Sequence, residues 1–232
     1  MKGNKFCALA VLLAIFLGGG VYVTEASAGV TPISTCQTIM SPGSYELTQN
    51  LNHDGTTPAN GCLEVDNNNV TIDLKGFTIA GSNTDSGIIT IGPQDNIVIR
   101  NGMIRDFDAG ISIGGADNCR VEWVIAFSND FDGIVLGNNC DANNNIASNN
   151  GDEGIVMDAN STIRNNIAND NATDGIEAGS NNNIIYNTAN GNGNNGIVVN
   201  CPGNLVGNTA QNNGVANLNQ VGAGCKRYNN LF

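Results

Sequence analysis

Six Gly-Ile pairs recur along this chain at a nearly constant interval, and this interval constrains the fold more than any other feature. The glycines stand 23, 23, 21, 21 and 21 residues apart. They are Gly87, Gly110, Gly133, Gly154, Gly175 and Gly196. A repeat of this length cannot bury its own hydrophobic face, so each unit must stack on the next. The chain is therefore predicted to form a solenoid.

The residues after each glycine alternate between apolar and variable positions. Ile134 and Leu136 flank Val135, a spacing typical of a β-strand with one buried face. The positions expected to face outward are Ser112, Val135, Val156, Glu177 and Val198. A helical solenoid would need repeats of about 33 residues or more, so helices are excluded. We expect each coil to contain three short strands and three turns, with successive coils about 4.8 Å apart.

A second motif, Asn-Ile/Thr-Ala-x-x-Asn, begins twelve residues after each of the last four glycines. Its first asparagines are Asn145, Asn166, Asn187 and Asn208, its last are Asn150, Asn171, Asn192 and Asn213, and Asn129 extends the second row by one coil. Stacked asparagines can form amide hydrogen bonds from coil to coil, and asparagine tolerates the left-handed backbone of tight corners. We interpret both rows as structural ladders. The alternative is a row of amides that binds sugar.

Four stretches resemble the right-handed parallel β-helix superfamily, and within it the exported pectate lyase-like and NosD-type proteins. They are Ser41–Leu47, Asn69–Ile79, Asn96–Gly102 and Phe107–Ile111, and the likeness covers roughly residues 36–225. The resemblance implies an all-β fold, a single-stranded right-handed parallel β-helix of about seven coils capped at both ends. It implies little about activity, because this superfamily includes lyases, hydrolases, epimerases and non-catalytic modules.

The first 28 residues have the features of a secretory signal peptide. Lys2 and Lys5 precede an apolar run over Phe6–Leu17, and Ala26–Ala28 is a small-residue cleavage site. A membrane anchor is the alternative, but Gly18–Gly20 interrupts the apolar run. We expect a secreted, periplasmic or cell-surface protein with no stable membrane insertion after cleavage. The expected parts are the signal peptide (1–28), an N-terminal cap (29–60), the β-helix (61–220) and a C-terminal cap (221–232).

The charge balance limits the partners. From residue 29 on, the chain has seven Lys/Arg and 20 Asp/Glu, a net charge of −13. Nucleic acids and anionic membranes are bound through basic patches, so neither is expected as a partner. A polysaccharide is the expected partner, and the oligomeric state stays open.

Six cysteines follow the predicted cleavage site, and an even number in an exported chain indicates disulfides. Cys119 and Cys140 each precede a repeat glycine by fourteen residues, so they should stack on adjacent coils. The predicted pairs are Cys36–Cys62, Cys119–Cys140 and Cys201–Cys225, and the outer two would brace the ends of the solenoid. The alternative, a thiolate metal site, lacks any Cys-x-x-Cys motif.

Ionisable and aromatic side chains gather in the early coils. The candidate catalytic residues are Arg100, Arg105, Asp106, Asp108, Arg120, Glu122 and Asp130, and the candidate glycan-binding aromatics are Trp123, Phe127 and Phe131. Carboxylates and arginines on consecutive coils suit glycoside hydrolysis, or lyase and epimerase chemistry on uronates. The alternative is a solvated flank in which Arg100 pairs with Glu122. The resemblance does not extend to the catalytic motifs of polygalacturonases or pectate lyases, which are missing from this chain.

An acidic row raises the question of a metal. Asp132, Glu153 and Asp174 each directly precede a repeat glycine, so they should stack and repel one another. Solvent screening is one explanation, and bound Ca²⁺ is the sharper one because hard oxygen ligands suit it. The chain offers few ligands for copper, since His53 is its only histidine.

Three functions follow from these patterns. The favoured one is an exported, non-catalytic module that binds glycans or serves as a surface or periplasmic scaffold. The second is a polysaccharide lyase, hydrolase or epimerase that uses the charged early coils. The third is a metal-handling NosD-type protein.

Overall fold

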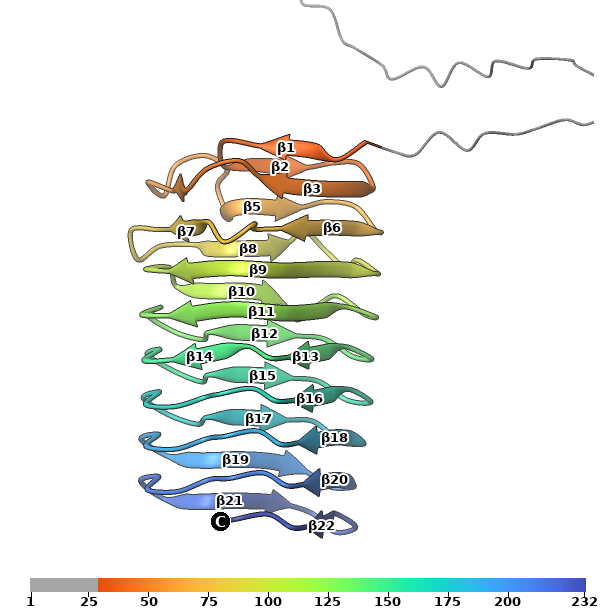
Figure 1. Ribbon diagram of the computed structural model, residues 1–232, viewed down its shortest axis with the longest axis vertical. Helices are drawn as coiled ribbons and strands as arrows, with labels where there is room; N and C mark the ends of the chain where they lie inside the picture. The colour runs from red at the N-terminus through yellow and green to blue at the C-terminus, as the bar shows by residue number, and fades with distance from the viewer. Residues whose placement is uncertain (1–28) are drawn as a thin grey trace, which may run out of the picture.

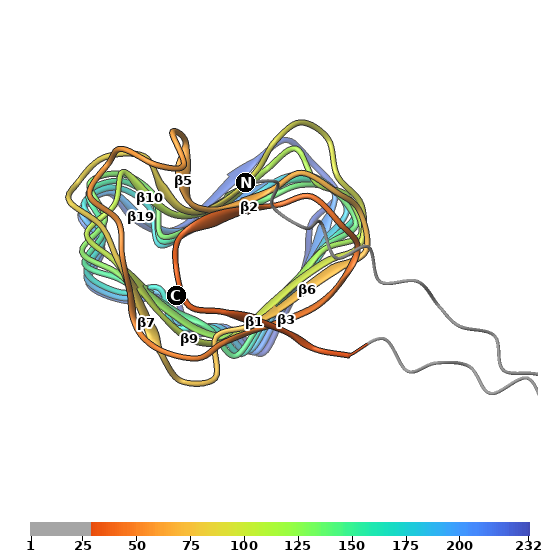
Figure 2. The ribbon, with the colours of Figure 1, turned by 90° about the horizontal axis from the view of Figure 1, so that it is seen from above.

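The computed structural model describes residues 29–232, which form an all-β solenoid of stacked parallel strands (Figure 1). The predicted signal peptide lies outside the described residues. Within residues 29–232 there is no apolar helix of membrane-spanning length. Seen along its axis, the chain winds around a single core in superimposed turns (Figure 2).

One sheet receives a single strand from every coil. Its nine strands are β2 (Gln37–Ile39), β5 (Gly61–Val65), β8 (Ser86–Thr90), β10 (Ala109–Ile113), β12 (Ile134–Leu136), β15 (Ile155–Met157), β17 (Ile176–Ala178), β19 (Asn195–Asn200) and β21 (Ala216–Val221). The described chain therefore has about nine coils, and the predicted seven is too few. Strands β2, β5 and β21 have the same place in the sheet but lack the Gly-Ile pair that marks the other six.

The second sheet has 13 strands and bends around a corner of the coil. Its main path is β1 (Thr31–Ile33), β3 (Gly43–Leu47), β6 (Val70–Asp73), β9 (Ile97–Arg105), β11 (Arg120–Phe127), β13 (Asp141–Asn143), β16 (Thr162–Arg164), β18 (Asn182–Ile185), β20 (Gly203–Val206) and β22 (Lys226–Tyr228). The short strands β4 (Leu51–Asn52), β7 (Thr78–Ala80) and β14 (Ile146–Ser148) pair beyond the corner. Single bridges continue this part of the sheet through Ile167, Thr188 and Thr209 to Leu231.

The repeat glycines are required because the coils stack closely. The register is constant, so Ile134 pairs with Ile155 and their side chains are fully buried. A Cβ atom on Gly154 would lie 2.6 Å from the carbonyl oxygen of Gly175 and 2.6 Å from Nδ2 of Asn171. No side chain fits there without displacing the next coil, which explains why the glycine recurs at the coil period.

Both asparagine rows are buried ladders, as predicted. Nδ2 of Asn145 donates to Oδ1 of Asn166 at 3.1 Å, and Asn166 repeats this bond to Asn187 at 3.0 Å. The second row does the same from Asn150 to Asn171 at 3.0 Å. Their burial excludes the alternative that these amides bind sugar.

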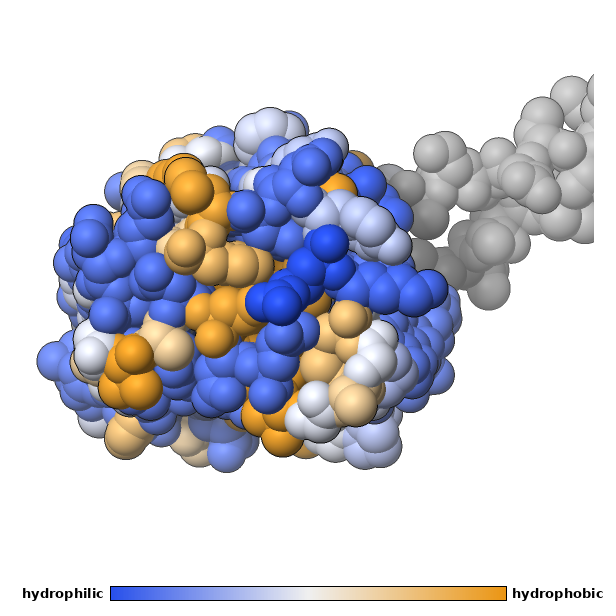
Figure 3. Space-filling model, turned by 90° about the horizontal axis from the view of Figure 1, so that it is seen from below, coloured by the Kyte–Doolittle hydropathy of each residue, from blue (hydrophilic) through white to orange (hydrophobic). Residues whose placement is uncertain are grey.

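Three disulfides brace the coil, with the predicted pairing of Cys36–Cys62, Cys119–Cys140 and Cys201–Cys225. The Cα atoms of Cys119 and Cys140 are 4.5 Å apart on adjacent coils. At the C-terminal end, Leu218 and Phe232 pack against the core, and apolar patches lie among hydrophilic residues when the molecule is viewed from that end (Figure 3).

Candidate functional site

The charged residues that the sequence groups together lie on different parts of the coil. Arg100, Arg120 and Glu122 are on the outer surface of β9 and β11, before the corner of the 13-stranded sheet. Arg105 ends β9 beyond that corner and pairs with its neighbour Asp106. The other predicted carboxylates are Asp108, in the turn that follows on this coil, and Asp130, in the same turn of the next coil. The structure therefore does not gather the predicted catalytic set into one site.

The arginines before the corner are held by carboxylates. The expected pair of Arg100 with Glu122 is wrong, although the two residues are opposite in the register. Nε of Arg100 instead lies 3.0 Å from Oδ2 of Asp73 on the preceding coil. Burial opposes ionisation of Asp73, but hydrogen bonds from the Lys75 amide, Asn101 and Arg100 lower its pKa below the usual value. Arg100 therefore adds to the stabilisation of the Asp73 carboxylate.

Arg120 and Arg164 share one partner. Nε of Arg120 lies 3.7 Å from Oδ2 of Asp141, and Nη2 of Arg164 lies 2.8 Å from the same oxygen. The guanidinium groups on the outer surface before the corner are therefore paired with the protein's own carboxylates.

At the corner of the 13-stranded sheet, one residue of each coil after the first has a left-handed backbone. We call these residues the first corner row: Lys75, Asn101, Trp123, Asn144, Asn165, Tyr186, Gly207 and Asn229, with φ between 52° and 64°. Asparagine and glycine adopt this conformation readily, whereas a bulky aromatic residue rarely does. Trp123 and Tyr186 nevertheless occupy the row at φ 58° and 54°.

Both aromatic side chains of the first corner row face solvent. Trp123 is 58% exposed and Tyr186 is 62% exposed. The ring of Tyr186 extends over the next coil, because a Cβ on Gly207 would lie 2.3 Å from Cδ1 and Cε1 of Tyr186. Glycine at position 207 therefore leaves the space that the ring fills.

A cavity of about 330 Å³ adjoins Trp123 on the same surface. It is lined by Trp123, Val124, Ile125, Asn144, Asn145, Ile146, Asn165 and Ile167. The cavity thus reaches from the coil of Trp123 over the next two coils, towards Tyr186. Its lining combines an aromatic ring, aliphatic side chains and the amides of the corner.

Two outward rows follow the first corner row. The nearer one is largely aliphatic, with Ile125 opposite Ile146 and Ile146 opposite Ile167. The farther one places Phe127 between Arg105 and Ser148, and Asn169 and Asn190 continue it by hydrogen bonds between neighbouring coils. Of the predicted glycan-binding aromatics, Trp123 and Phe127 therefore belong to one surface.

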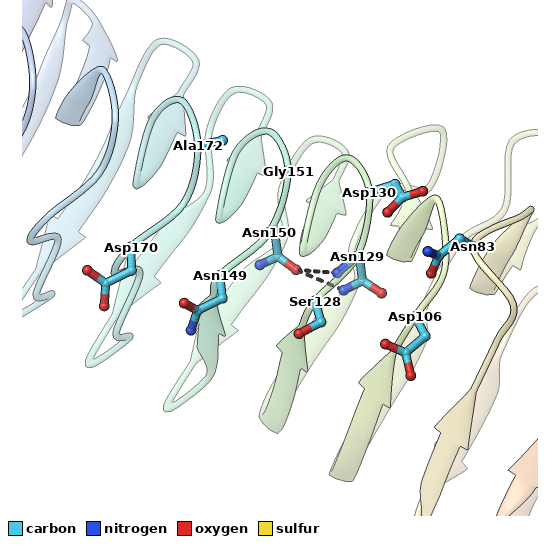
Figure 4. Close-up of a pocket in the computed structure, with 10 residues that line it drawn as sticks. All are labelled: Asn83, Asp106, Ser128, Asn129, Asp130, Asn149, Asn150, Gly151, Asp170 and Ala172. Atoms are coloured by element: carbon cyan, nitrogen blue, oxygen red, sulfur yellow. Dashed lines mark hydrogen bonds between the residues drawn. The ribbon is translucent and has the colours of Figure 1, made fainter.

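A second left-handed corner bounds this surface. Asn83, Asp106, Ser128, Asn149 and Asp170 have φ between 55° and 60° and lie in line along the solenoid (Figure 4). They form one side of a groove of about 560 Å³, which is also lined by Asp130 and by the buried asparagines of the second ladder. We call the surface between the two left-handed corners the corner face. The groove brings the candidates Asp106 and Asp130 together.

Phe131 lies apart from the corner face. It is 55% exposed in the turn after the second corner, where its amide donates to the carbonyl of Asp108. Phe131 therefore does not share a surface with Trp123.

The predicted acidic row is present beside that turn. Backbone hydrogen bonds stack Asp132, Glu153 and Asp174 on successive coils, and Asp152 and Glu177 adjoin them. Burial, the hydrogen bond to Asp132 and the charge of Asp152 raise the pKa of Glu153 to about 8. Carboxylate oxygens of neighbouring members lie within 4.8 Å of one another. The expectation that they hold Ca²⁺ stays a prediction.

His53 is buried, and its Nε2 lies 3.4 Å from Oδ2 of Asp85. Its ring stacks on Phe107 with ring centres 6.2 Å apart. The only histidine of the chain is thus enclosed in the early coils.

Sequence reasoning missed Tyr186, and it gave the left-handed corners to the ladder asparagines instead of the residues directly before them. The signal was available, because Tyr186 follows Trp123 by 63 residues, three repeats of 21. It was hidden because the corner asparagines Asn144 and Asn165 stand directly before the ladder asparagines and resemble them in sequence.

Comparison with solved structures identifies similar folds. A pectate lyase, Pel9A, is 18% identical with a TM-score of 0.58, and the alignment covers 86% of this chain and 64% of that one. The periplasmic alginate epimerase AlgG, as a double mutant, is 16% identical with a TM-score of 0.53, covering 84% and 67%. The A-module of the mannuronan C-5 epimerase AlgE4 from Azotobacter vinelandii is 15% identical with a TM-score of 0.52, covering 73% and 59%.

At these identities the likeness shows the fold, and this chain spans about two thirds or less of the length of each structure. No curated protein sequence matches the chain. A model of the right-handed β-helix region matches residues 41–179 and 86–232, which together cover most of the chain. The chain belongs to the right-handed β-helix family.

Proposed function

We propose that this protein is an exported, non-catalytic module that binds a glycan on the corner face. One observation carries the proposal: Trp123 and Tyr186 occupy left-handed corner positions with their rings exposed. An aromatic ring offers a flat apolar surface for a sugar ring, and neighbouring amides bond its hydroxyl groups.

The energetics favour a binding role for these rings. A left-handed backbone costs a non-glycine residue roughly 1–2 kcal/mol, and asparagine is among the few residues that adopt it routinely. Four other coils place asparagine at this corner. Burial offsets only part of the cost for Trp123 or Tyr186, since more than half of each residue's surface is exposed. Strained residues of this kind cluster at ligand-binding sites.

Export is supported by the covalent structure. Three disulfides in a chain of this size are typical of oxidising compartments outside the cytosol. One structure of similar fold is described as a periplasmic epimerase. Both observations agree with the signal peptide expected over residues 1–28.

A polysaccharide-processing enzyme is the second candidate, and the groove with Asp106 and Asp130 is the observation that favours it. Two carboxylates facing one groove are the minimum for glycoside hydrolysis. Arg105 neutralises Asp106, however, and the other arginines near the corner face are paired elsewhere.

The test compares wild type with Trp123→Asn by calorimetric titration against a panel of oligosaccharides. Asparagine is the residue that this corner already uses, so the variant should fold. We expect about a tenfold loss of affinity for the bound glycan, as for an exposed aromatic anchor. Phe131→Ala is the matched control, because it removes an exposed aromatic ring outside the corner face.

Binding that is equal in wild type and Trp123→Asn would contradict the proposal. The same panel is assayed for unsaturated products and new reducing ends. Turnover that disappears in Asp130→Asn would favour the enzyme instead.

A further inference from the structure

We infer that the ligand of the corner face is an uncharged glycan whose chain lies along the solenoid axis, from Trp123 towards Tyr186. This inference rests on the proposed function and adds the ligand's charge class and direction. The similar structures are named as a pectate lyase and alginate epimerases. The inferred ligand therefore differs in charge from the polyuronates in those names.

The pairing of the charged residues near the corner face supports the first part of the inference, that the ligand is uncharged. A polyuronate brings one carboxylate per sugar, and its recognition requires cationic groups that are available to it. Here Arg105 pairs with Asp106, and Arg120 and Arg164 share Asp141. Each of these guanidinium groups lies within ion-pairing distance of a carboxylate of the protein.

The other basic residues do not change this balance. Arg100 and Lys75 pair with Asp73 and Glu46. The remaining ones in the described chain, Lys226 and Arg227, are in the last strand, β22. The net charge of −13 from residue 29 on adds a long-range repulsion of any polyanion.

On the coils from Trp123 to Tyr186, the polar groups of the corner face are neutral, apart from Asp170 at the second corner. Oδ1 of Asn169 accepts a hydrogen bond from the Asn190 amide at 2.8 Å, and Oδ1 of Asn190 accepts one from Gln211 at 2.8 Å. Their carbonyl oxygens are thus engaged along the solenoid, which leaves the Nδ2 groups as donors. Together with Asn144 and Asn165, they offer the neutral hydrogen bonds that sugar hydroxyl groups require.

The geometry of the first corner row supports the second part of the inference, that the glycan chain lies along the solenoid axis. Trp123, Asn144, Asn165 and Tyr186 are on consecutive coils. At the spacing of parallel strands, three coil steps place the two aromatic positions about 14 Å apart. The cavity beside Trp123 extends over Asn144 and Asn165, in the direction of Tyr186. A linear chain of several sugars along the axis contacts both rings, whereas a single sugar contacts only one.

The test is calorimetric titration of the intact protein with hexasaccharides. Neutral probes are β-glucan, mannan and xylan oligomers, and uronate probes are galacturonate and mannuronate oligomers. We expect a neutral hexasaccharide to bind at least tenfold more tightly than either uronate, with little change between low and high salt. Arg164→Gln should leave the affinity for the neutral hexasaccharide within twofold, because Arg164 pairs with Asp141 and does not contact the ligand.

The direction is tested with Tyr186→Asn and with oligomers of different length. In wild type, affinity should increase from the disaccharide to the hexasaccharide of the same glycan. In Tyr186→Asn this increase should be lost, while the affinity for the disaccharide stays within twofold. An increase that Tyr186→Asn leaves intact would overturn the axial placement.

Tighter binding of a uronate that requires Trp123 and weakens in Arg164→Gln would overturn the charge class while leaving the proposed function in place. No binding by any oligomer, or binding indifferent to Trp123, would instead contradict the proposed function itself. The melting temperature of each variant is measured alongside, so that a folding defect is recognised as such.

Discussion

Two rows of residues run side by side along the solenoid, one buried and one exposed, and their sequences obey different rules. The buried ladder is invariant, with Asn145, Asn166, Asn187 and Asn208 on successive coils. The residues directly before them form the exposed first corner row and vary, reading Asn144, Asn165, Tyr186 and Gly207.

The difference follows from the hydrogen bonds that each position must make. A ladder side chain both donates and accepts inside the core, so only asparagine satisfies it. A corner residue has only to tolerate a left-handed backbone. Aromatic residues tolerate that conformation poorly, so their presence in the exposed row indicates a function other than stabilising the fold.

Replacing a ladder residue should have the largest effect. Asn166→Ala removes four hydrogen bonds and leaves the amide groups of Asn145 and the carbonyl of Ala142 buried without their partner. We expect a loss of about 3 kcal/mol in the free energy of unfolding, measured by urea denaturation. Asn165→Gly, one residue earlier, is the control and should change stability by less than about 0.5 kcal/mol, because glycine accepts the left-handed corner. Equal effects at both positions would remove the distinction between the rows.

The stacked carboxylates give a smaller effect that depends on pH. The pKa of Glu153 is raised to about 8 in the folded protein. The folded state therefore favours protonated Glu153, and the associated stability is lost as the pH rises from the usual value of 4.5 to about 8. We expect the melting temperature to fall by several degrees between about pH 5 and pH 8, and to fall less in Glu153→Gln.

The raised pKa values of Asp132 and Glu177 act in the same direction. The lowered pKa values of Asp73 and Glu64 act only in acid, below this window. A melting temperature that stays constant over this pH range would contradict the raised pKa of Glu153. If Ca²⁺ is added at high pH, recovery of the wild-type melting temperature but not that of Glu153→Gln would support the predicted metal site.

The smallest expected effect on stability concerns the exposed row. Trp123→Asn restores the residue that other coils use at this corner, so the variant should be more stable by about 1 kcal/mol. That gain corresponds to a rise of roughly 2–4 °C in melting temperature, measured by differential scanning calorimetry. A loss of stability would show that Trp123 serves the fold and would weaken the argument for binding.

Much of the fold could be predicted from the sequence because a solenoid converts sequence spacing into spatial neighbours. Once the glycine period gives the register, Cys119 must lie beside Cys140, and Asn145 beside Asn166. The predicted number of coils is too low because the first two coils and the last coil lack the repeat Gly-Ile pair.

The site was harder to predict because spacing determines which coil a residue is on, but not which face its side chain occupies. Arg105 and Arg120 are close in sequence and lie on opposite sides of the left-handed corner. Phe127 and Phe131 are separated by the second corner in the same way. Arg100 bonds to Asp73 and not to Glu122 because of the hydrogen bonds around a buried carboxylate, which a repeat pattern does not reveal.

The most direct measurement combines stability and affinity in the double variant Trp123→Asn, Tyr186→Asn. Its melting temperature and its titration with a neutral hexasaccharide are recorded beside those of wild type. We expect the variant to melt at a higher temperature and to lose at least tenfold in affinity, since the rings cost folding energy and supply binding energy. A variant that melts lower and binds the glycan as tightly as wild type would contradict the account.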